Sequence, residues 1–84
     1  MTIFVANFDP ETEEADLKEL FGDFGKVNDV HICMDWRTGE PLGYAFIEMP
    51  LDGEAEDAIR TLDGKRWNGR RLKVSEKQER RREY

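Results

Sequence analysis

The order in which strand-like and helix-like segments follow one another constrains this chain most. A short β-prone run at residues 3–8 ends at Asp9-Pro10, and apolar residues at helical spacing follow up to Phe24. Two further strand patterns, at residues 27–34 and 43–49, precede a second helical pattern and a last strand at residues 71–74. This β-α-β-β-α-β order predicts an α+β, ferredoxin-like fold, in which a four-stranded antiparallel sheet carries two helices on one face.

Local signals predict where the two helices begin and end. Thr12 is expected to cap the first helix, and Gly25 suits the position just past its end. Asp52 is expected to cap the second helix. The apolar positions that we expect to pack against the sheet are Ala15, Leu17, Leu20, Phe21 and Phe24 in the first helix, and Ala55, Ala58, Ile59 and Leu62 in the second.

Length and cysteine content exclude several classes of protein. A chain of 84 residues forms one domain with one modest core. Cys33 is the only cysteine, so no internal disulfide can form and a secreted cysteine scaffold is excluded. No apolar run approaches the ~20 residues that span a bilayer, and the first residues carry no basic leader. We therefore expect a domain at residues 1–75, a charged tail at 76–84, no membrane association and a reducing, cytoplasmic compartment.

The charge of the chain is unevenly distributed along it. The formal net charge is −6, which alone argues against a nucleic-acid partner. Residues 1–57 carry 15 acidic and 3 basic residues, however, and residues 58–84 carry 4 acidic and 10 basic ones. We expect most of the acidic residues to lie on the helices, behind the sheet. The negative total charge therefore does not exclude a nucleic-acid partner on the face of the sheet that the helices leave open.

Strand alternation predicts which side chains stand on the open face of the sheet, away from the helices. Glu48 cannot lie unpaired in an apolar core, so Ala45, Ile47 and Met49 face the helices, and Tyr44 and Phe46 face outward. The same reasoning turns Ile3, Val5, Val30, Ile32, Met34, Leu72 and Val74 inward, and Phe4, His31, Cys33, Arg71, Lys73 and Ser75 outward. Three large aromatic rings on an exposed face indicate a contact site, and flat rings of this kind stack on bases.

Two segments of the chain resemble the signatures of the RNA recognition motif family. Residues 3–8 are similar to its shorter signature, RNP2, and residues 42–49 to RNP1, whose usual form is K/R-G-F/Y-G/A-F-V-x-F/Y. The resemblance extends over residues 2–75, and the compact chain also looks like short bacterial proteins with a single such domain. Two positions depart from RNP1: Leu42 replaces the basic first residue, and Met49, which should face the core, replaces the last aromatic residue.

The resemblance implies that the chain binds single-stranded RNA without catalysis. The base-stacking positions of the family correspond to Phe4, Tyr44 and Phe46, with room for about two to four nucleotides. A role in post-transcriptional regulation or RNA chaperoning follows, for a monomer that needs no cofactor and no metal. The further candidate contacts with RNA are Asn7, His31, Arg71 and Lys73, together with Trp36 and Arg37 in the loop at residues 35–42.

Several alternatives remain open at the level of the sequence. The acidic helical face could bind a protein partner, although the loop Arg66-Trp67-Asn68 lacks the Phe of peptide-binding relatives. A small ferredoxin-like enzyme, such as an acylphosphatase, would need a glycine-rich phosphate loop after the first strand, which is missing. His31 and Cys33 do not complete a zinc site, which needs four ligands. Trp36 either stacks on a base or packs on its own loop, Trp67 belongs to the rim of the core, and Arg80, Arg81 and Arg82 either contact phosphates or form a solvated end.

Overall fold

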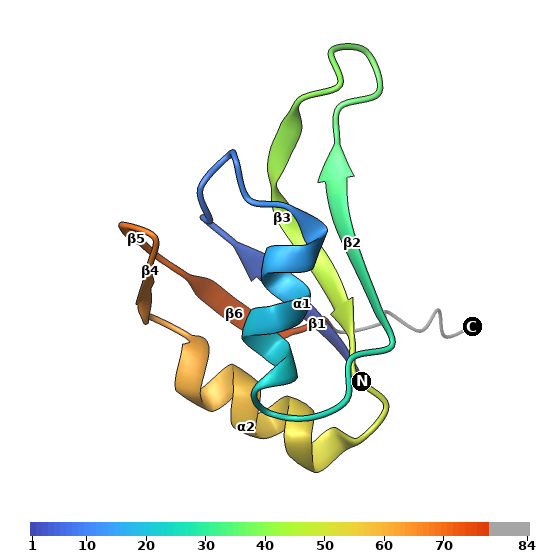
Figure 1. Ribbon diagram of the computed structural model, residues 1–84, viewed down its shortest axis with the longest axis vertical. Coiled ribbons are helices and arrows are strands. Elements are labelled where there is room, and N and C mark those ends of the chain that lie inside the picture. The colour runs from blue at the N-terminus through green and yellow to red at the C-terminus, as the bar shows by residue number, and fades with distance from the viewer. Residues whose placement is uncertain (78–84) are drawn as a thin grey trace, which may run out of the picture.

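The computed structural model describes residues 1–77, and residues 78–84, with Arg80, Arg81 and Arg82, lie outside the described part. The elements are β1 (Thr2–Ala6), α1 (Glu14–Gly22), β2 (Asp29–Met34), β3 (Pro41–Glu48), α2 (Asp52–Leu62), β4 (Arg66–Trp67), β5 (Arg70–Arg71) and β6 (Lys73–Glu76). Four strands form an antiparallel sheet in the order β2-β3-β1-β6, and both helices cover the same face of it (Figure 1). The predicted fold is therefore confirmed, with β4 and β5 added as a small separate hairpin.

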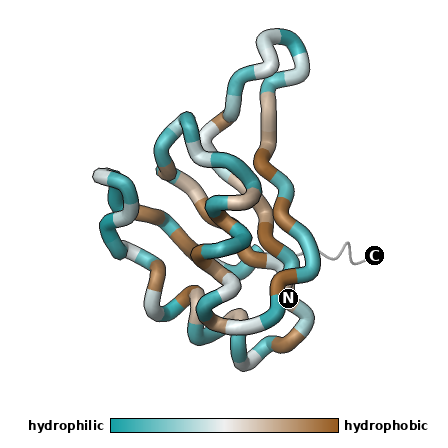
Figure 2. Tube along the Cα trace, viewed as in Figure 1, coloured by the Kyte–Doolittle hydropathy of each residue, from teal (hydrophilic) through white to brown (hydrophobic). Residues whose placement is uncertain are grey.

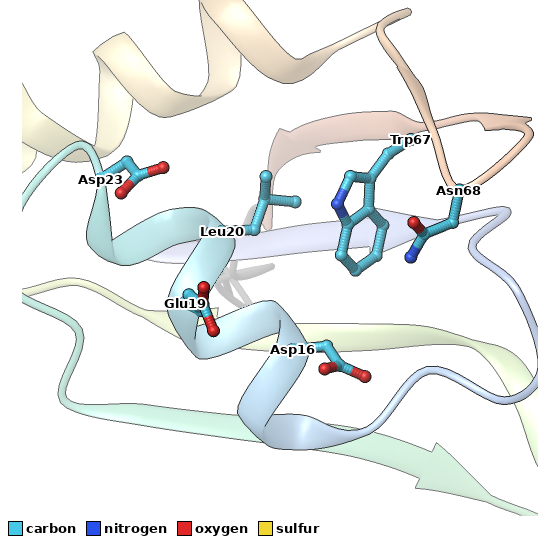
Figure 3. A pocket seen from close by; sticks show the side chains of 6 residues that line it. All are labelled: Asp16, Glu19, Leu20, Asp23, Trp67 and Asn68. Atoms are coloured by element: carbon cyan, nitrogen blue, oxygen red, sulfur yellow. The ribbon is translucent and has the colours of Figure 1, made fainter.

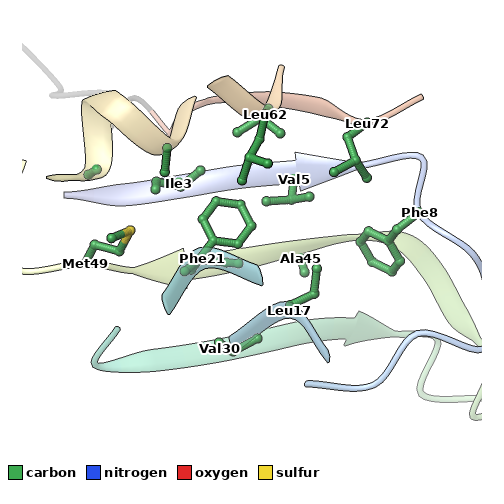
Figure 4. Packing of buried hydrophobic residues seen from close by; sticks show 14 of the residues in the cluster. Ile3, Val5, Phe8, Leu17, Phe21, Val30, Ala45, Met49, Leu62 and Leu72 are labelled. Carbon is green, nitrogen blue, oxygen red and sulfur yellow. The ribbon is translucent and has the colours of Figure 1, made fainter. Parts of the chain in front are cut away.

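The core lies between the sheet and the two helices. Ile3, Val5, Ala45 and Ile47 are fully buried on the helix-facing side of the two central strands, as alternation predicts. Figure 4 shows Ile3, Val5 and Ala45 meeting side chains from both helices in one apolar layer, and Ile47 belongs to the same buried cluster. Hydrophobic residues concentrate along the strands and recur at intervals within the helices, and the loops are largely hydrophilic (Figure 2). From the helices, this layer takes Leu17, Phe21, Ala55, Ala58 and Leu62.

The helices begin and end at slightly different residues from those predicted. Glu13, not Thr12, precedes the first turn of α1, and its backbone N–H donates to Asp16 Oδ2 at 3.0 Å. Thr12 is buried instead, and its backbone N–H donates to the carbonyl of Asp9. Asp52 is the first residue of α2 and not its cap, a place where a carboxylate still favours the positive helix end.

Gly25 lies further from α1 than predicted, because the helix ends at Gly22 and Asp23 follows as its C-cap. Gly25 has another reason to lack a side chain. The side chain of Glu54 from α2 packs against it and accepts a hydrogen bond from the backbone N–H of Lys26 at 3.0 Å. Gly25 thus allows α2 to hold the connection between α1 and β2.

Two predictions about strands and one about a helix need correction. Ala15, which was expected to pack against the sheet, is exposed on α1. Met34 is 53% exposed, because the pairing of β2 with β3 shifts between Ile32 and Met34 and the regular alternation is interrupted there. The last main strand, β6, begins at Lys73 rather than Arg71. Leu72 exchanges backbone hydrogen bonds with Gly64 and Lys65 after α2, so it does not pair with β1.

The Asn68-Gly69 turn is confirmed as a hairpin turn between β4 and β5. Both residues have positive φ, at 51° and 83°, as a two-residue turn with the twist of a hairpin requires. The turn places the half-buried Trp67 against the core, as predicted. In residues 1–77, neither helix has the length and apolar character needed to cross a membrane.

Candidate nucleic-acid interface

Three aromatic side chains form a cluster at the centre of the open face. Phe4 of β1 pairs directly with Phe46 of β3, and Tyr44 lies two residues before Phe46 on the same face of β3. The ring centroids are 5.8 Å apart for Phe4 and Tyr44, 5.9 Å for Phe4 and Phe46, and 6.0 Å for Tyr44 and Phe46. All three side chains are partly exposed. The structure therefore brings together the three residues that the sequence predicted for stacking.

Strand register places polar residues on both sides of this cluster. His31 of β2 lies opposite Phe46, and Ser75 of β6 lies opposite Phe4. Lys73 of β6 lies opposite Ala6, which in turn lies opposite Tyr44 of β3. His31, Lys73 and Ser75 are all exposed. They extend the open face from the aromatic centre to both edges of the sheet.

Lys77 is a residue of the open face that the sequence analysis assigned to the tail. Its backbone N–H donates to the carbonyl of Thr2 at 2.8 Å, which continues the β6 ladder past Glu76. Its Nζ lies 5.2 Å from the centroid of the Phe46 ring, within the range of a cation–π contact. Lys73 and Ser75 face outward, so extending the alternation by two residues would have predicted that Lys77 also lies on the open face.

The side-chain amide of Asn7 contacts the backbone of Arg71 rather than its guanidinium group. Asn7 follows β1 with φ of 66°, a left-handed conformation that Asn tolerates well. Its Nδ2 donates to the carbonyl of Arg71 at 2.8 Å, which ties the end of β1 to β5. The amide of Asn7 therefore has a structural role, and the exposed side chain of Arg71 extends from the segment that it holds.

Trp36 and Arg37 do not join the aromatic cluster. They lie in the loop between β2 and β3, which extends well beyond the body of the domain (Figure 1). Trp36 is 88% exposed, and the guanidinium carbon of Arg37 lies 5.6 Å from the centroid of its ring. The Asp35 side chain holds the loop by accepting from the backbone N–H of Arg37 at 2.8 Å. Trp36 thus packs on Arg37 and has most of its surface free.

Cys33 shares a strand with His31, but the described residues show no metal centre. Among residues 1–77, no three His, Cys, Asp or Glu side chains are grouped so that they could hold a metal ion. Partial burial raises the pKa of the Cys33 thiol above its ordinary value, because the thiolate is less well solvated there. A thiol in this state is a poor nucleophile near neutral pH.

The opposite side of the molecule carries a shallow acidic depression between α1 and the β4–β5 hairpin. Its volume is about 360 Å³. Figure 3 shows the carboxylates of Asp16, Glu19 and Asp23 along α1, with Leu20 facing the ring of Trp67. The acidic residues of α1 therefore lie behind the sheet, as the charge distribution predicted.

A four-stranded antiparallel sheet with two helices on one face and three clustered rings on the other defines an aromatic-faced domain of the kind that stacks on unpaired bases. The sequence profile of the RNA recognition motif family matches residues 3–73. The chain belongs to this family.

Individual relatives agree with the family assignment. The chain is 45% identical to "Putative RNA-binding protein RbpD" of Nostoc sp. over 75 residues, which cover 89% of this chain and 80% of that protein. The crystal structure of RNA-binding protein PG1 superposes with a TM-score of 0.91 at 34% identity, over 98% of this chain and 99% of that one. The Rna15 domain solved with bound RNA (GU) gives a TM-score of 0.82 at 26% identity, over 93% and 83% of the two chains.

Proposed function

We propose that this chain binds single-stranded RNA by stacking bases on Phe4, Tyr44 and Phe46, without catalysis. The observation that carries the proposal is the ring cluster itself, with three centroids 5.8–6.0 Å apart on a face that neither helix covers. Aromatic rings cost free energy when they face water, and base stacking on such rings contributes ~1–3 kcal/mol per base. The Rna15 domain solved with bound RNA (GU) supports RNA as the ligand.

The charges around the rings fit a short, weakly held RNA segment. Lys73 and Lys77 lie on the β6 side of the cluster. Arg71 is the last residue of β5 and comes two residues before β6 begins. These cations would contact phosphates, and His31 would add a polar or stacking contact beside Phe46. Three rings in one cluster accommodate about two to four nucleotides. Asn7, Trp36 and Arg37 are secondary contacts in this proposal, with Trp36 reached by RNA that continues along β2 and β3.

The exposed edge of β2 supports a monomer. The backbone N–H of Ile32 donates to Glu14 Oε2 at 3.4 Å, and that of Val30 donates to Asp29 Oδ1 at 3.0 Å. Carboxylates that bond to these edge groups discourage a second sheet from pairing there. A monomeric RNA-binding domain of this size suits post-transcriptional regulation or RNA chaperoning in the cytoplasm, and it needs neither metal nor cofactor.

The test compares Phe46→Ala with Trp67→Ala in titrations of the full chain with short single-stranded RNA. Phe46→Ala should weaken binding by about 1–3 kcal/mol, or roughly 5- to 150-fold, because one stacking surface is lost. Trp67→Ala removes an aromatic side chain of the opposite side and should leave RNA affinity unchanged. Phe46→Leu keeps apolar bulk in place of the ring, so it separates loss of stacking from loss of folding.

Nuclear magnetic resonance then locates the RNA. Shifts in amide signals should concentrate on β1 and β3. If they fall on α1 and the β4–β5 hairpin, or if Trp67→Ala weakens binding as much as Phe46→Ala, the stacking proposal fails. That outcome would favour the alternative, in which the acidic side of α1 binds a partner.

A further inference from the structure

A row of polar side chains borders the aromatic cluster on the open face. Glu48 of β3 pairs with Thr2 of β1 on one side and with Asp29 of β2 on the other. Thr2 and Glu48 lie two positions from Phe4 and Phe46 on the same face, about 7 Å along the strands, and Asp29 lies two positions from His31. A base that stacks on Phe4 or Phe46 therefore has one of its edges near this row.

Glu48 is held in place within the row. The hydroxyl of Thr2 donates to its Oε2 at 2.6 Å, across the β1–β3 pairing, and both side chains are partly buried. This bond fixes the carboxylate beside the rings and leaves lone pairs on both oxygens. Because an ionised carboxylate only accepts hydrogen bonds, a phosphate is repelled there and a group that donates is favoured.

We propose that Glu48 is a specificity-determining residue that selects guanine at the site next to the ring cluster. The Watson–Crick edge of guanine carries two adjacent donors, N1–H and the N2 amino group, which match the two oxygens of a carboxylate as a guanidinium does. Uracil offers one N–H between two carbonyl oxygens that the carboxylate repels. Adenine and cytosine offer one amino donor beside a ring acceptor. This inference rests on the proposed RNA binding and adds a base preference to it.

The experiment uses five-nucleotide, fluorescein-labelled RNAs that consist of uridine except for a central guanosine, inosine, adenosine, cytidine or uridine. Uniform flanks let each probe slide until the variable base reaches its preferred site. Anisotropy titrations of the full chain should give about tenfold tighter binding for the guanosine probe than for all-uridine, the range of a bidentate contact to a base edge. Inosine lacks the N2 amino group and should fall between the two.

Glu48→Gln is the decisive variant, since its amide keeps the shape and a partner for Thr2 but offers only one acceptor. It should reduce the preference for guanosine over uridine to less than about threefold. Asp29→Asn, at the end of the same row, is the matched control and should retain the preference. Circular dichroism checks that both variants are folded.

The proposal is overturned by equal affinity of the wild-type chain for the guanosine and uridine probes, or by a preference that survives Glu48→Gln. Equal strengthening of all probes by this variant would mean that Glu48 acts only as a repulsive charge, which also overturns the proposal. Phe46→Ala separates the two levels of inference. If it weakens every probe while guanosine is not preferred, base selection by Glu48 fails and RNA binding stands. If it weakens none, the proposed function fails.

Discussion

The salt dependence of RNA binding follows from where the cations of the open face lie. Lys73, Lys77 and Arg71 are the three that border the rings on the β6 side within the described residues. Each phosphate neutralised on a single strand contributes about −0.7 to the slope of log affinity against log salt, so three contacts predict a slope of about −2. Raising salt from about 50 to about 200 mM should then weaken binding roughly 15- to 20-fold.

The assay is a series of anisotropy titrations of one short RNA at four or more concentrations of KCl. Lys73→Ala should make the slope shallower by about 0.7, because one phosphate contact is removed. Lys18→Ala, an exposed cation on α1, is the matched control and should leave the slope unchanged. A slope steeper than about −4, or an equal change in both variants, would refute the assignment of phosphate contacts to these three cations.

Two further predictions concern stability, measured by urea and thermal denaturation. Gly25→Ala should lower the free energy of unfolding by about 2 kcal/mol, because a Cβ there overlaps Glu54 and displaces its hydrogen bond with Lys26. Gly22→Ala, which has open space around the added Cβ, is the control. An equal loss of stability in both variants would contradict the reasoning. Thr12→Val should raise the free energy of unfolding by about 1 kcal/mol, since within residues 1–77 the buried Thr12 Oγ1 has no hydrogen-bond partner, and a loss of stability would contradict this.

The sequence was sufficient to predict the fold and the ring cluster because both depend on simple periods. Side chains alternate strictly along a strand. Once Glu48 was assigned to the outer face, Tyr44 and Phe46 had to lie on that face as well. The same rule placed Phe4, and the structure brings the three rings together. Their role in binding RNA stays a prediction until the titrations are done.

Features that depend on register between strands could not be predicted from alternation alone. Alternation gives the face of Thr2 and Glu48, but only the pairing of β1 with β3 shows that they are neighbours joined by a hydrogen bond. Lys77 was missed because β6 continues into a segment whose composition is typical of a tail. Thr12 was predicted as a cap because hydroxyl residues favour that position, yet tertiary packing buried it and left Glu13 to begin the helix.

The spacing of the three rings has a consequence for RNA that is already folded. Successive bases in a helix stack at about 3.4 Å, whereas the ring centroids are 5.8–6.0 Å apart and their planes are inclined by 31° to 72°. Two bases that occupy neighbouring rings therefore cannot remain stacked on each other. Each such separation costs about a few kcal/mol, comparable to what a ring returns. The domain would thus discriminate among RNAs by how weakly their own bases are stacked, and when abundant it would lower the melting temperature of marginal hairpins.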